Sequence, residues 1–342
     1  MPLSDVPRGR PTLAELAAQL GVSSATVSKV INGRSGVSAE VREHIEQTLR
    51  ARGYAKPLVN GNNDTIDLVF DELQDPAQLP IIAGALDAVE RHGLRLSIHR
   101  WQNRRSSTSD IVSEAVRRKP AGLILVRDRI TPQERDGMSA RKLNFVSLNP
   151  RGSPAADTYA VYCDNWAGAL SAGRHLIEAG HRRIAMVTGP ENVLASDART
   201  GGFVTALREH GVSLDADYVV RGDFSVESGM AAGDRLLALP VPPTAIFAQN
   251  DLEALGVYAA AQKAGVAIPD QLSVVGFDDM PLAATLFPAL TTVHQPLAEM
   301  ASRAVDIAVA VGRNESVPHH SVLATHLISR GSVSPPRDPT SR

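Results

Sequence analysis

Apolar residues recur at helical spacing near the start of the chain. Their positions i, i+3, i+4 and i+7 predict one apolar stripe along a helix. The stripe consists of Leu13, Leu16, Ala17 and Leu20. Thr12 and Glu15 form a capping box that begins this helix, and Gly21 ends it in a tight turn.

Two further short helices are predicted after that turn. The second is capped by Ser23, ends at Gly33 and faces inward with Val27, Val30 and Ile31. The third runs from the cap Ser38 to Gly53, and its inner residues are Val41, Ile45 and Leu49. Three helices with so short a turn are typical of a helix-turn-helix head, whose second helix enters the major groove of DNA.

The outer side of the second helix carries short polar residues, as groove contact requires. Lys29 reaches guanine acceptors or a phosphate, and hydroxyl groups donate to phosphates or base edges. We expect the following residues to contact DNA: Ser23, Ser24, Ala25, Thr26, Ser28, Lys29 and Asn32. The alternative is a plain helical hairpin whose outer face is only solvated.

From Ile66 onward, short apolar runs alternate with helical patterns, which predicts parallel sheets with helices on both faces. Two such series suggest two similar lobes. The predicted strands are 66–70, 94–99, 122–126, 144–148, 183–189, 244–249 and 272–277. The predicted helices are 79–93, 109–119, 165–180, 200–211 and 251–265.

Composition and charge agree with a globular chain that meets a polyanion at one end. The 342 residues carry a net charge of −2. Residues 1–57 hold eight Lys/Arg against five Asp/Glu, so this head is basic and the rest acidic. The chain has no long apolar run and no apolar signal segment, and Cys163 is its only cysteine. We therefore expect a cytoplasmic protein without disulfides.

The head "TLAELAAQLGVSSATVSKVINGRSGVSAEVREHIEQTLRARGY" resembles that of the lactose-repressor (LacI/GalR) family of bacterial transcription factors. "GHRRIAMVTGP", "RTGGF", "AQNDLEALG", "SVVGFDD" and "PALTTVHQPL" resemble the family's effector-binding core, which is itself similar to periplasmic sugar-binding proteins. The resemblance spans about residues 11–334.

The resemblance implies an all-α helix-turn-helix head and a two-lobed, periplasmic-binding-protein-like α/β core. The chain is expected to cross between the lobes near Tyr162, Thr292 and Leu323, with helix 297–311 in the first lobe. The expected segments are the head 11–56, a linker 57–65, the core 66–334 and a disordered tail 335–342. Within the core, the first lobe is about 66–162 and 293–322, and the second about 163–291.

Polar residues follow several predicted strands, where such folds bind ligands. By resemblance, five positions match effector contacts: Asp164, Arg199, Phe224, Asn250 and Asp278. Carboxylates and the planar guanidinium suit a polyhydroxylated ligand, and Phe224 suits stacking on a sugar or base face.

Each of these residues has a structural alternative. Asn250 and Asp251 sit where they would cap the helix that follows, and Asp278 or Asp279 where it would cap a turn. Arg199 is alternatively a salt bridge within a lobe. Phe224 is alternatively a core residue, and Trp166 is assigned to packing. His319 and His320 lack further ligands at useful spacing, so they are assigned to the surface and no metal is expected.

The linker departs from the family pattern. Between Tyr54 and Ile66 the chain has only "AKPLVNGNNDT", which predicts a flexible link without the family's hinge helix. Leu58 is the only candidate for a minor-groove wedge, and Lys56 offers a backbone contact instead.

Together these features predict a repressor without a cofactor, acting as a homodimer on a near-palindromic operator under control of a small molecule, a sugar. The family also includes members that respond to purines. A solute-binding protein would explain the lobes but not the head. An enzyme is disfavoured because the chain has no G-x-S-x-G, P-loop or H-E-x-x-H motif.

Overall fold

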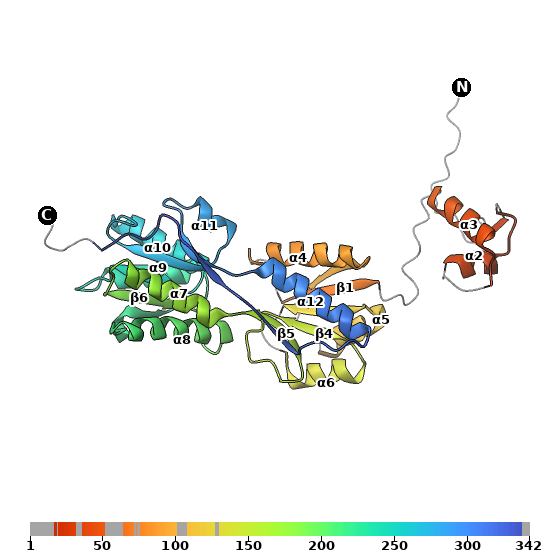
Figure 1. The fold of residues 1–342 in the computed structure, drawn as a ribbon, viewed down its shortest axis with the longest axis horizontal. Coiled ribbons are helices and arrows are strands. Elements are labelled where there is room, and N and C mark those ends of the chain that lie inside the picture. The colour runs from red at the N-terminus through yellow and green to blue at the C-terminus, as the bar shows by residue number, and fades with distance from the viewer. Residues whose placement is uncertain are drawn as a thin grey trace, which may run out of the picture. The chain divides into compact units, whose positions relative to one another are not determined.

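The computed structural model describes residues 17–18, 20–31, 36–51, 64–71, 73, 76–100, 108–126 and 130–336. The chain forms two compact units, Met1–Asn62 and Asn63–Arg342. The described part of the first unit is helical, and the second is α/β (Figure 1). In the described part of the chain, no helix has both the length and the apolar character needed to cross a bilayer.

In the described part of the small unit, four apolar side chains are buried together. Residues 17, 18 and 20 are helical, and the helices α2 (Ser24–Ile31) and α3 (Ala39–Ala51) follow. Gly21 has a φ of +64°, which confirms the prediction of a tight turn there. The core consists of Ala17, Val27, Val30 and Ile45. The predicted helix start at residue 12 and the predicted helix ends at Gly33 and Gly53 lie outside the described residues.

The first lobe of the large unit contains a six-stranded parallel sheet in the order β11-β5-β4-β3-β1-β2. Its strands are β1 (Thr65–Phe70), β2 (Arg95–Arg100), β3 (Gly122–Val126), β4 (Phe145–Leu148), β5 (Tyr159–Cys163) and β11 (His320–Leu323). The helices that flank it in the described part of the chain are α4 (Gln78–Arg91), α5 (Thr108–Arg118), α6 (Pro132–Ala140) and α12 (Leu297–Gly312). Helices α4 and α12 pack on one face, and α5 and α6 pack on the other.

The second lobe repeats this plan with the sheet order β12-β10-β9-β8-β6-β7, in which β12 alone is antiparallel to its neighbour. Its strands are β6 (Ile184–Thr188), β7 (Val219–Arg221), β8 (Ala245–Ala248), β9 (Ser273–Asp278), β10 (Thr291–His294) and β12 (His326–Ile328). Its helices are α7 (Asn165–Glu178), α8 (Leu194–Glu209), η1 (Ala216–Tyr218), α9 (Val226–Leu237), α10 (Asp251–Ala264) and α11 (Pro281–Thr285).

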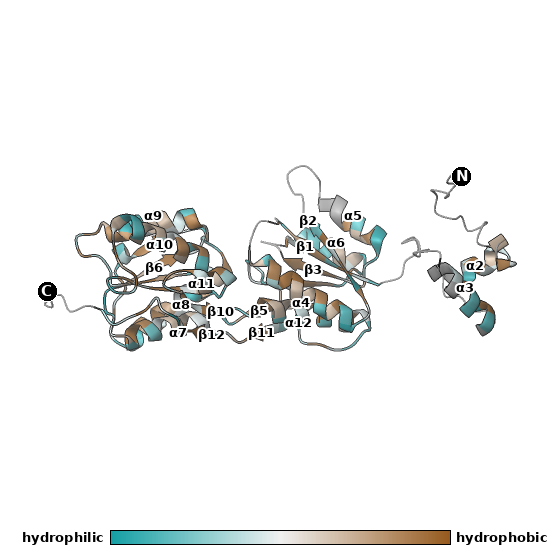
Figure 2. Ribbon diagram, turned by 90° about the horizontal axis from the view of Figure 1, so that it is seen from above, coloured by the Kyte–Doolittle hydropathy of each residue, from teal (hydrophilic) through white to brown (hydrophobic). Residues whose placement is uncertain are grey.

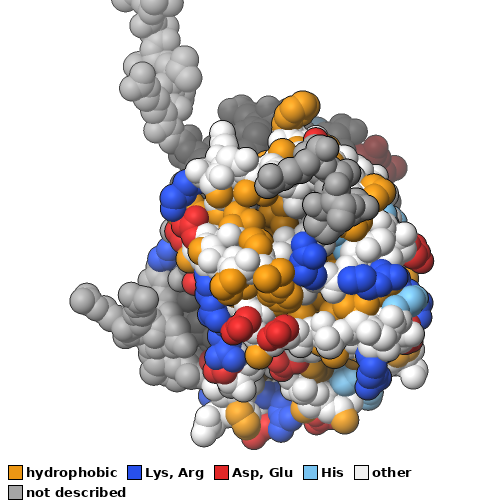
Figure 3. Space-filling view, turned by 90° about the vertical axis from the view of Figure 1, so that its left-hand side faces the viewer, with side chains coloured by type: hydrophobic (Ala, Val, Ile, Leu, Met, Phe, Trp, Pro, Cys, Tyr) orange, Lys and Arg blue, Asp and Glu red, His pale blue; other side chains and the backbone are white. Residues whose placement is uncertain are grey.

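Helices α7 and α8 cover one face of the second sheet, and α9 and α10 cover the other. Small residues allow these helix pairs to touch: a β-carbon at Gly202 would collide with the backbone of α7, and one at Gly229 with that of α10. Brown hydrophobic ribbons mark these layers in Figure 2. Hydrophobic side chains also gather on the outer end of this lobe, with charged ones around them (Figure 3).

The chain passes between the two lobes three times. The passages follow Cys163 at the end of β5, His294 at the end of β10 and Leu323 at the end of β11. All three lie at carboxyl ends of strands, so the carboxyl edges of the two sheets face each other. Figure 2 shows β5, β10, β11 and β12 at this junction. Ligands of such sheets bind beyond the carboxyl ends.

Several elements differ from the sequence prediction. Helix α8 begins at Leu194, six residues before the predicted start at Thr200, and its N-cap Val193 offers no side-chain cap. Helix α9 was not predicted; it contains two glycines, which lower helix propensity. Helix α6 was also missed, although Thr131 and Glu134 form a complete capping box.

Candidate functional site

Helix α2 presents a polar outer side. The Ser23 hydroxyl accepts a hydrogen bond from the Thr26 N–H at 3.1 Å, which confirms the predicted cap. Val27 and Val30 are buried, whereas Ser24 and Lys29 are exposed.

The remaining predicted DNA contacts differ in their surroundings. Ala25 is exposed, Thr26 and Ser28 are half-buried, and the Thr26 hydroxyl lies 2.8 Å from that of Ser23. The predicted backbone contact Asn32 lies outside the described residues. A cation and small hydroxyl residues therefore share the side of α2 that faces away from its core.

The second lobe carries a buried polar cluster around Arg199, a residue of α8 that is 4% exposed. Its guanidinium lies over the Phe277 ring, with Cζ 3.6 Å from the ring centroid. The cluster, called the Arg199 cluster, consists of Asn165, Arg199, Gln249, Asp278 and Gln295.

Hydrogen bonds from Arg199 tie together four chain segments. Its Nε donates to Asn165 Oδ1 at 2.8 Å, and its Nη1 donates to the Gln249 carbonyl. Its Nη2 lies 3.2 Å from Asp278 Oδ1 and 3.4 Å from Gln295 Oε1. The guanidinium is therefore shared by α7 and by the ends of β8, β9 and β10.

Asn250 has the capping role that the sequence left open. Its Oδ1 accepts a hydrogen bond from the Glu253 N–H at 2.8 Å and so caps α10. Its Nδ2 donates to the Phe224 carbonyl at 3.0 Å. Asp164 likewise caps α7, with Oδ1 2.9 Å from the Ala167 nitrogen. Both side chains are engaged with the protein, and each caps a helix next to the cluster.

Asp278 and Asp279 form a turn in which both residues have positive φ, +110° and +56°. Such backbone is costly for residues other than glycine. Asp279 is held by Arg330 at 2.6 Å and by His294 at 2.9 Å. These contacts fix the turn that directs Asp278 toward Arg199.

Gln249 and Gln295 belong to this cluster but were not singled out from the sequence. Gln249 is fully buried and accepts hydrogen bonds from the Gly189 N–H and the Ser196 hydroxyl, both at 2.8 Å. Gln295 is 4% exposed, and its Nε2 has no hydrogen-bond partner among the described residues. Both directly follow strands of the second sheet, but the sequence placed Gln249 inside a predicted strand, 244–249, and predicted no strand before Gln295.

Two buried carboxyl groups stand on the first turn of α10. Burial raises the pKa of Asp251 to about 8, with the nearby Asp278 adding to the effect. Burial also raises the pKa of Glu253 to about 8. Asp251 accepts hydrogen bonds from the Met280 N–H at 2.7 Å and the Thr292 hydroxyl at 2.5 Å. At neutral pH the protonated form of each group is therefore favoured.

These shifts predict a pH-dependent stability. An unfolded chain releases the two protons near the ordinary values of 3.8 and 4.5, whereas the fold holds them to about pH 8. The free energy of unfolding is expected to fall as pH rises from about 4 to about 8, because the native state binds more protons. Urea unfolding across this range measures the slope. The Asp251→Asn, Glu253→Gln double variant should make the free energy of unfolding less dependent on pH. If its pH dependence is unchanged, other groups cause it.

Hollows of different sizes lie outside this cluster in the described part of the chain. One, of about 560 Å³, lies between the lobes and is bounded by Arg135 and Ser147 of the first and by Leu194 and Asp197 of the second. The Leu194 N–H donates to the Arg151 carbonyl at 2.6 Å across this junction. This volume is in the range of small-molecule sites.

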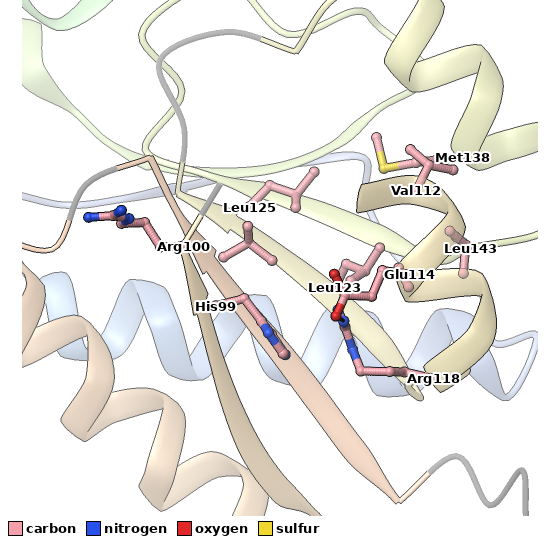
Figure 4. A pocket seen from close by; sticks show the side chains of 11 residues that line it. His99, Arg100, Val112, Glu114, Arg118, Leu123, Leu125, Met138 and Leu143 are labelled. Atoms are coloured by element: carbon pink, nitrogen blue, oxygen red, sulfur yellow. Dashed lines mark ion pairs between the residues drawn. The ribbon is translucent and has the colours of Figure 1, made fainter. Parts of the chain in front are cut away.

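A smaller hollow lies inside the first lobe and measures about 80 Å³ (Figure 4). Leu123, Leu125 and Met138 bound it, and Arg118 meets Glu114 at its rim at 2.9 Å. Its volume suffices for a few water molecules but not for a sugar. His319 and His320 are exposed and lie against tyrosines of β5.

Comparison with known proteins agrees with this architecture. A family model described as "Bacterial regulatory proteins, lacI family" matches residues 12–56. A model described as "Periplasmic binding protein-like domain" matches residues 174–333. The HTH-type transcriptional repressor CytR of Escherichia coli (strain K12) is 31% identical, over 94% of this chain and 96% of CytR. The HTH-type transcriptional regulator CelR of Thermobifida fusca is 33% identical, over 95% of this chain and 99% of CelR.

Solved structures match as well. The structure of the transcriptional regulator CelR with cellobiose has a TM-score of 0.72 at 31% identity and covers 94% of this chain and 100% of that one. The lac repressor dimer bound to operator and the anti-inducer ONPF has a TM-score of 0.81 at 24% identity and covers 95% and 100%, a likeness of fold. The resemblance seen in the sequence is thus confirmed, and the chain belongs to the lacI family of bacterial regulatory proteins.

Proposed function

We propose that this protein is an operator-binding transcriptional repressor whose DNA affinity is set by a sugar bound at the Arg199 cluster. The observation that carries the proposal is the pairing of a helix-turn-helix unit with a buried polar cluster at the carboxyl ends of an α/β sheet. The relatives CytR and CelR are a transcriptional repressor and a transcriptional regulator. The protein acts in the cytoplasm, where its operator lies, and it has no catalytic role.

The chemistry of the cluster favours a ligand with several hydroxyl groups. Asp278 offers a carboxylate at 10% side-chain exposure, and Gln295 offers an amide donor without a partner among the described residues. The Phe224 ring is half-buried and supplies an apolar face for a sugar ring. Buried polar groups of this kind reject ligands that leave them unpaired.

Arg199 has a second role in this proposal. Hydrogen bonds to Asn165 and Gln249 occupy two of its donors, and a third nitrogen faces Asp278 and Gln295. The guanidinium therefore holds the ligand-facing groups in place before any ligand arrives. Such preorganisation lowers the free-energy cost of binding.

Regulation follows if the ligand binds one arrangement of the lobes better than another. The three passages of chain near Cys163, His294 and Leu323 are the natural hinge. A coupling of about 1–3 kcal/mol would change operator affinity about 5- to 150-fold.

A homodimer is part of the proposal because one helix-turn-helix unit reads only a few base pairs. Large apolar side chains remain exposed on the first lobe of a single chain: Leu79 and Leu86 on α4, Ile98 on β2 and Val322 on β11. A second copy of the chain would cover such residues and set two heads on a near-palindromic site.

Selection of binding sequences from random duplex DNA tests the function. We expect near-palindromic duplexes to be enriched and their affinity to fall steeply with salt, since the head displaces counterions. If no duplex is enriched, the alternative function, a solute-binding protein, is supported instead. A thermal-shift panel of sugars that includes cellobiose and ribose, with nucleosides as a separate arm, then decides the ligand class.

Replacing Lys29 with alanine is expected to weaken operator binding about 5- to 150-fold, because a base or phosphate contact contributes about 1–3 kcal/mol. Fluorescence anisotropy on a selected duplex measures the change. Lys263→Ala is the matched control, since it removes the same charge from an exposed pair with Asp234 in the second lobe. Equal affinities of the two variants would remove Lys29 from the interface.

A further inference from the structure

Phe224, the aromatic residue next to the Arg199 cluster, stands in an unfavourable backbone conformation. Its φ is +70°, in the left-handed region that favours glycine. For other residues such backbone costs about 1–3 kcal/mol and persists only when surrounding contacts enforce it. The contacts that enforce it determine where the aromatic ring lies.

Two side chains at the N-terminus of α10, one from its N-cap and one from its first turn, hold the peptide groups of Phe224. Glu253 Oε1 accepts a hydrogen bond from the Phe224 N–H at 2.9 Å. Asn250 Nδ2 donates to the Phe224 carbonyl at 3.0 Å. Both peptide groups of one strained residue are thus bonded to neighbours in a single helix turn.

The structure also provides a slot for the Glu253 carboxyl group. Glu253 is fully buried. A β-carbon at Gly222 would collide with Oε1 of Glu253, so the glycine makes room for this side chain. Gly229 lies against the backbone of Glu253 in the same way. Packing at Gly222 therefore places the carboxyl group, and packing at Gly229 places the backbone that carries it.

The Phe224 ring reaches the ligand-facing side of this arrangement. A β-carbon at Gly189 would collide with the ring, so the ring lies directly against the end of β6. The Arg199 Cζ lies 6.0 Å from the ring centroid. A shift of the 222–224 backbone would move the ring relative to both.

We propose that Glu253 is a positioning residue of the effector site: it fixes Phe224 in its left-handed conformation and thereby sets the aromatic wall that a sugar ring meets. This inference rests on the proposed effector site. It extends that proposal, because Glu253 touches no ligand and acts through Phe224.

The protonation of Glu253 is consistent with this role. Burial raises its pKa to about 8, so the neutral carboxyl group is favoured at neutral pH. Its Oε2 has no hydrogen-bond partner among the described residues, and only Oε1 is needed to hold Phe224. Glutamine keeps that acceptor in a side chain of the same shape, whereas methionine removes it at similar length.

Fluorine NMR of the full chain labelled with 4-fluorophenylalanine tests the inference without ligand or DNA. The chain has seven phenylalanines, so seven signals are expected, and Phe224→Leu identifies one by its loss. In Glu253→Met we expect the Phe224 signal to leave its native position while the other six stay. In Glu253→Gln we expect all seven to stay.

Asn250→Asp is a second variant for the case in which Glu253→Met does not fold. Aspartate keeps the cap of α10 but replaces the donor to the Phe224 carbonyl with an acceptor. We expect the Phe224 signal to move in this variant too. The inference is overturned if the Phe224 signal keeps its native position in Glu253→Met. If Glu253→Met does not fold, a native Phe224 signal in Asn250→Asp overturns it. A Glu253→Gln spectrum that changes as much as that of Glu253→Met also overturns it. Neither result bears on operator binding, which the duplex selection tests separately.

Discussion

Replacing Arg199 with methionine is expected to lower the free energy of unfolding of the two-lobed core by about 3–5 kcal/mol and to abolish the ligand response. The substitution leaves the Asp278 carboxylate and Asn165 Oδ1 without their buried cation. It also leaves the Gln249 carbonyl, at the end of β8, without its donor. Removing one partner of a buried charge pair costs the desolvation of the group that stays.

Urea unfolding followed by circular dichroism measures the loss. Arg174→Met is the matched control, since Arg174 pairs with Glu209 on the surface, where both side chains are more than 40% exposed. Exposed pairs contribute about 0–1 kcal/mol. If the two variants lose the same stability, the Arg199 hydrogen bonds do not organise the second lobe.

The fold was predictable to the extent that local patterns determine it. Apolar runs such as "GLILV" and "TAIFA" became buried parallel strands, and the capped stripe after Thr12 led to a helix-turn-helix unit. Local patterns did not predict where the chain crosses between the lobes. Helix α12 packs on the first sheet, although it follows β10 of the second sheet, and only the family resemblance predicted this crossing.

The candidate site was predictable as a set of positions but not as a set of roles. The resemblance selected Arg199 and Asp278, which the fold joins through a hydrogen bond, and Asn250, which directly follows Gln249 of the same cluster. The cap at Asn250 and a salt bridge at Arg199 were open alternatives in the sequence, and the structure confirms both. The sequence did not show that Arg199 is engaged by neighbours 34 to 96 residues away along the chain. Such partners depend on how helices pack on the sheet, which periodicity does not encode. Glu253 was missed because a glutamate after a helix cap ordinarily faces solvent.

The role of Asp67 was not predicted from the sequence either, and replacing its partner Arg118 is the second change for which we expect a large loss of stability. In "IDLVF" it is the one charged residue of a buried strand, and it is fully buried in β1. Arg118 of α5 donates to its Oδ2 from Nε at 3.0 Å and from Nη2 at 2.8 Å. His99 of β2 lies 3.5 Å from the same oxygen. Figure 4 shows Arg118 and His99 beside the small cavity of this lobe.

Arg118→Met is therefore expected to cost about 3–5 kcal/mol in the free energy of unfolding, because it leaves the Asp67 carboxylate buried without its cation. The double variant Asp67→Val, Arg118→Met should recover most of that loss, since replacing a buried ion pair with apolar side chains is often neutral or stabilising. Urea unfolding of both variants decides the matter. If the double variant is as unstable as Arg118→Met, the loss does not come from the unpaired charge of Asp67. Arg118 would then stabilise the lobe through its packing and its ion pair with Glu114.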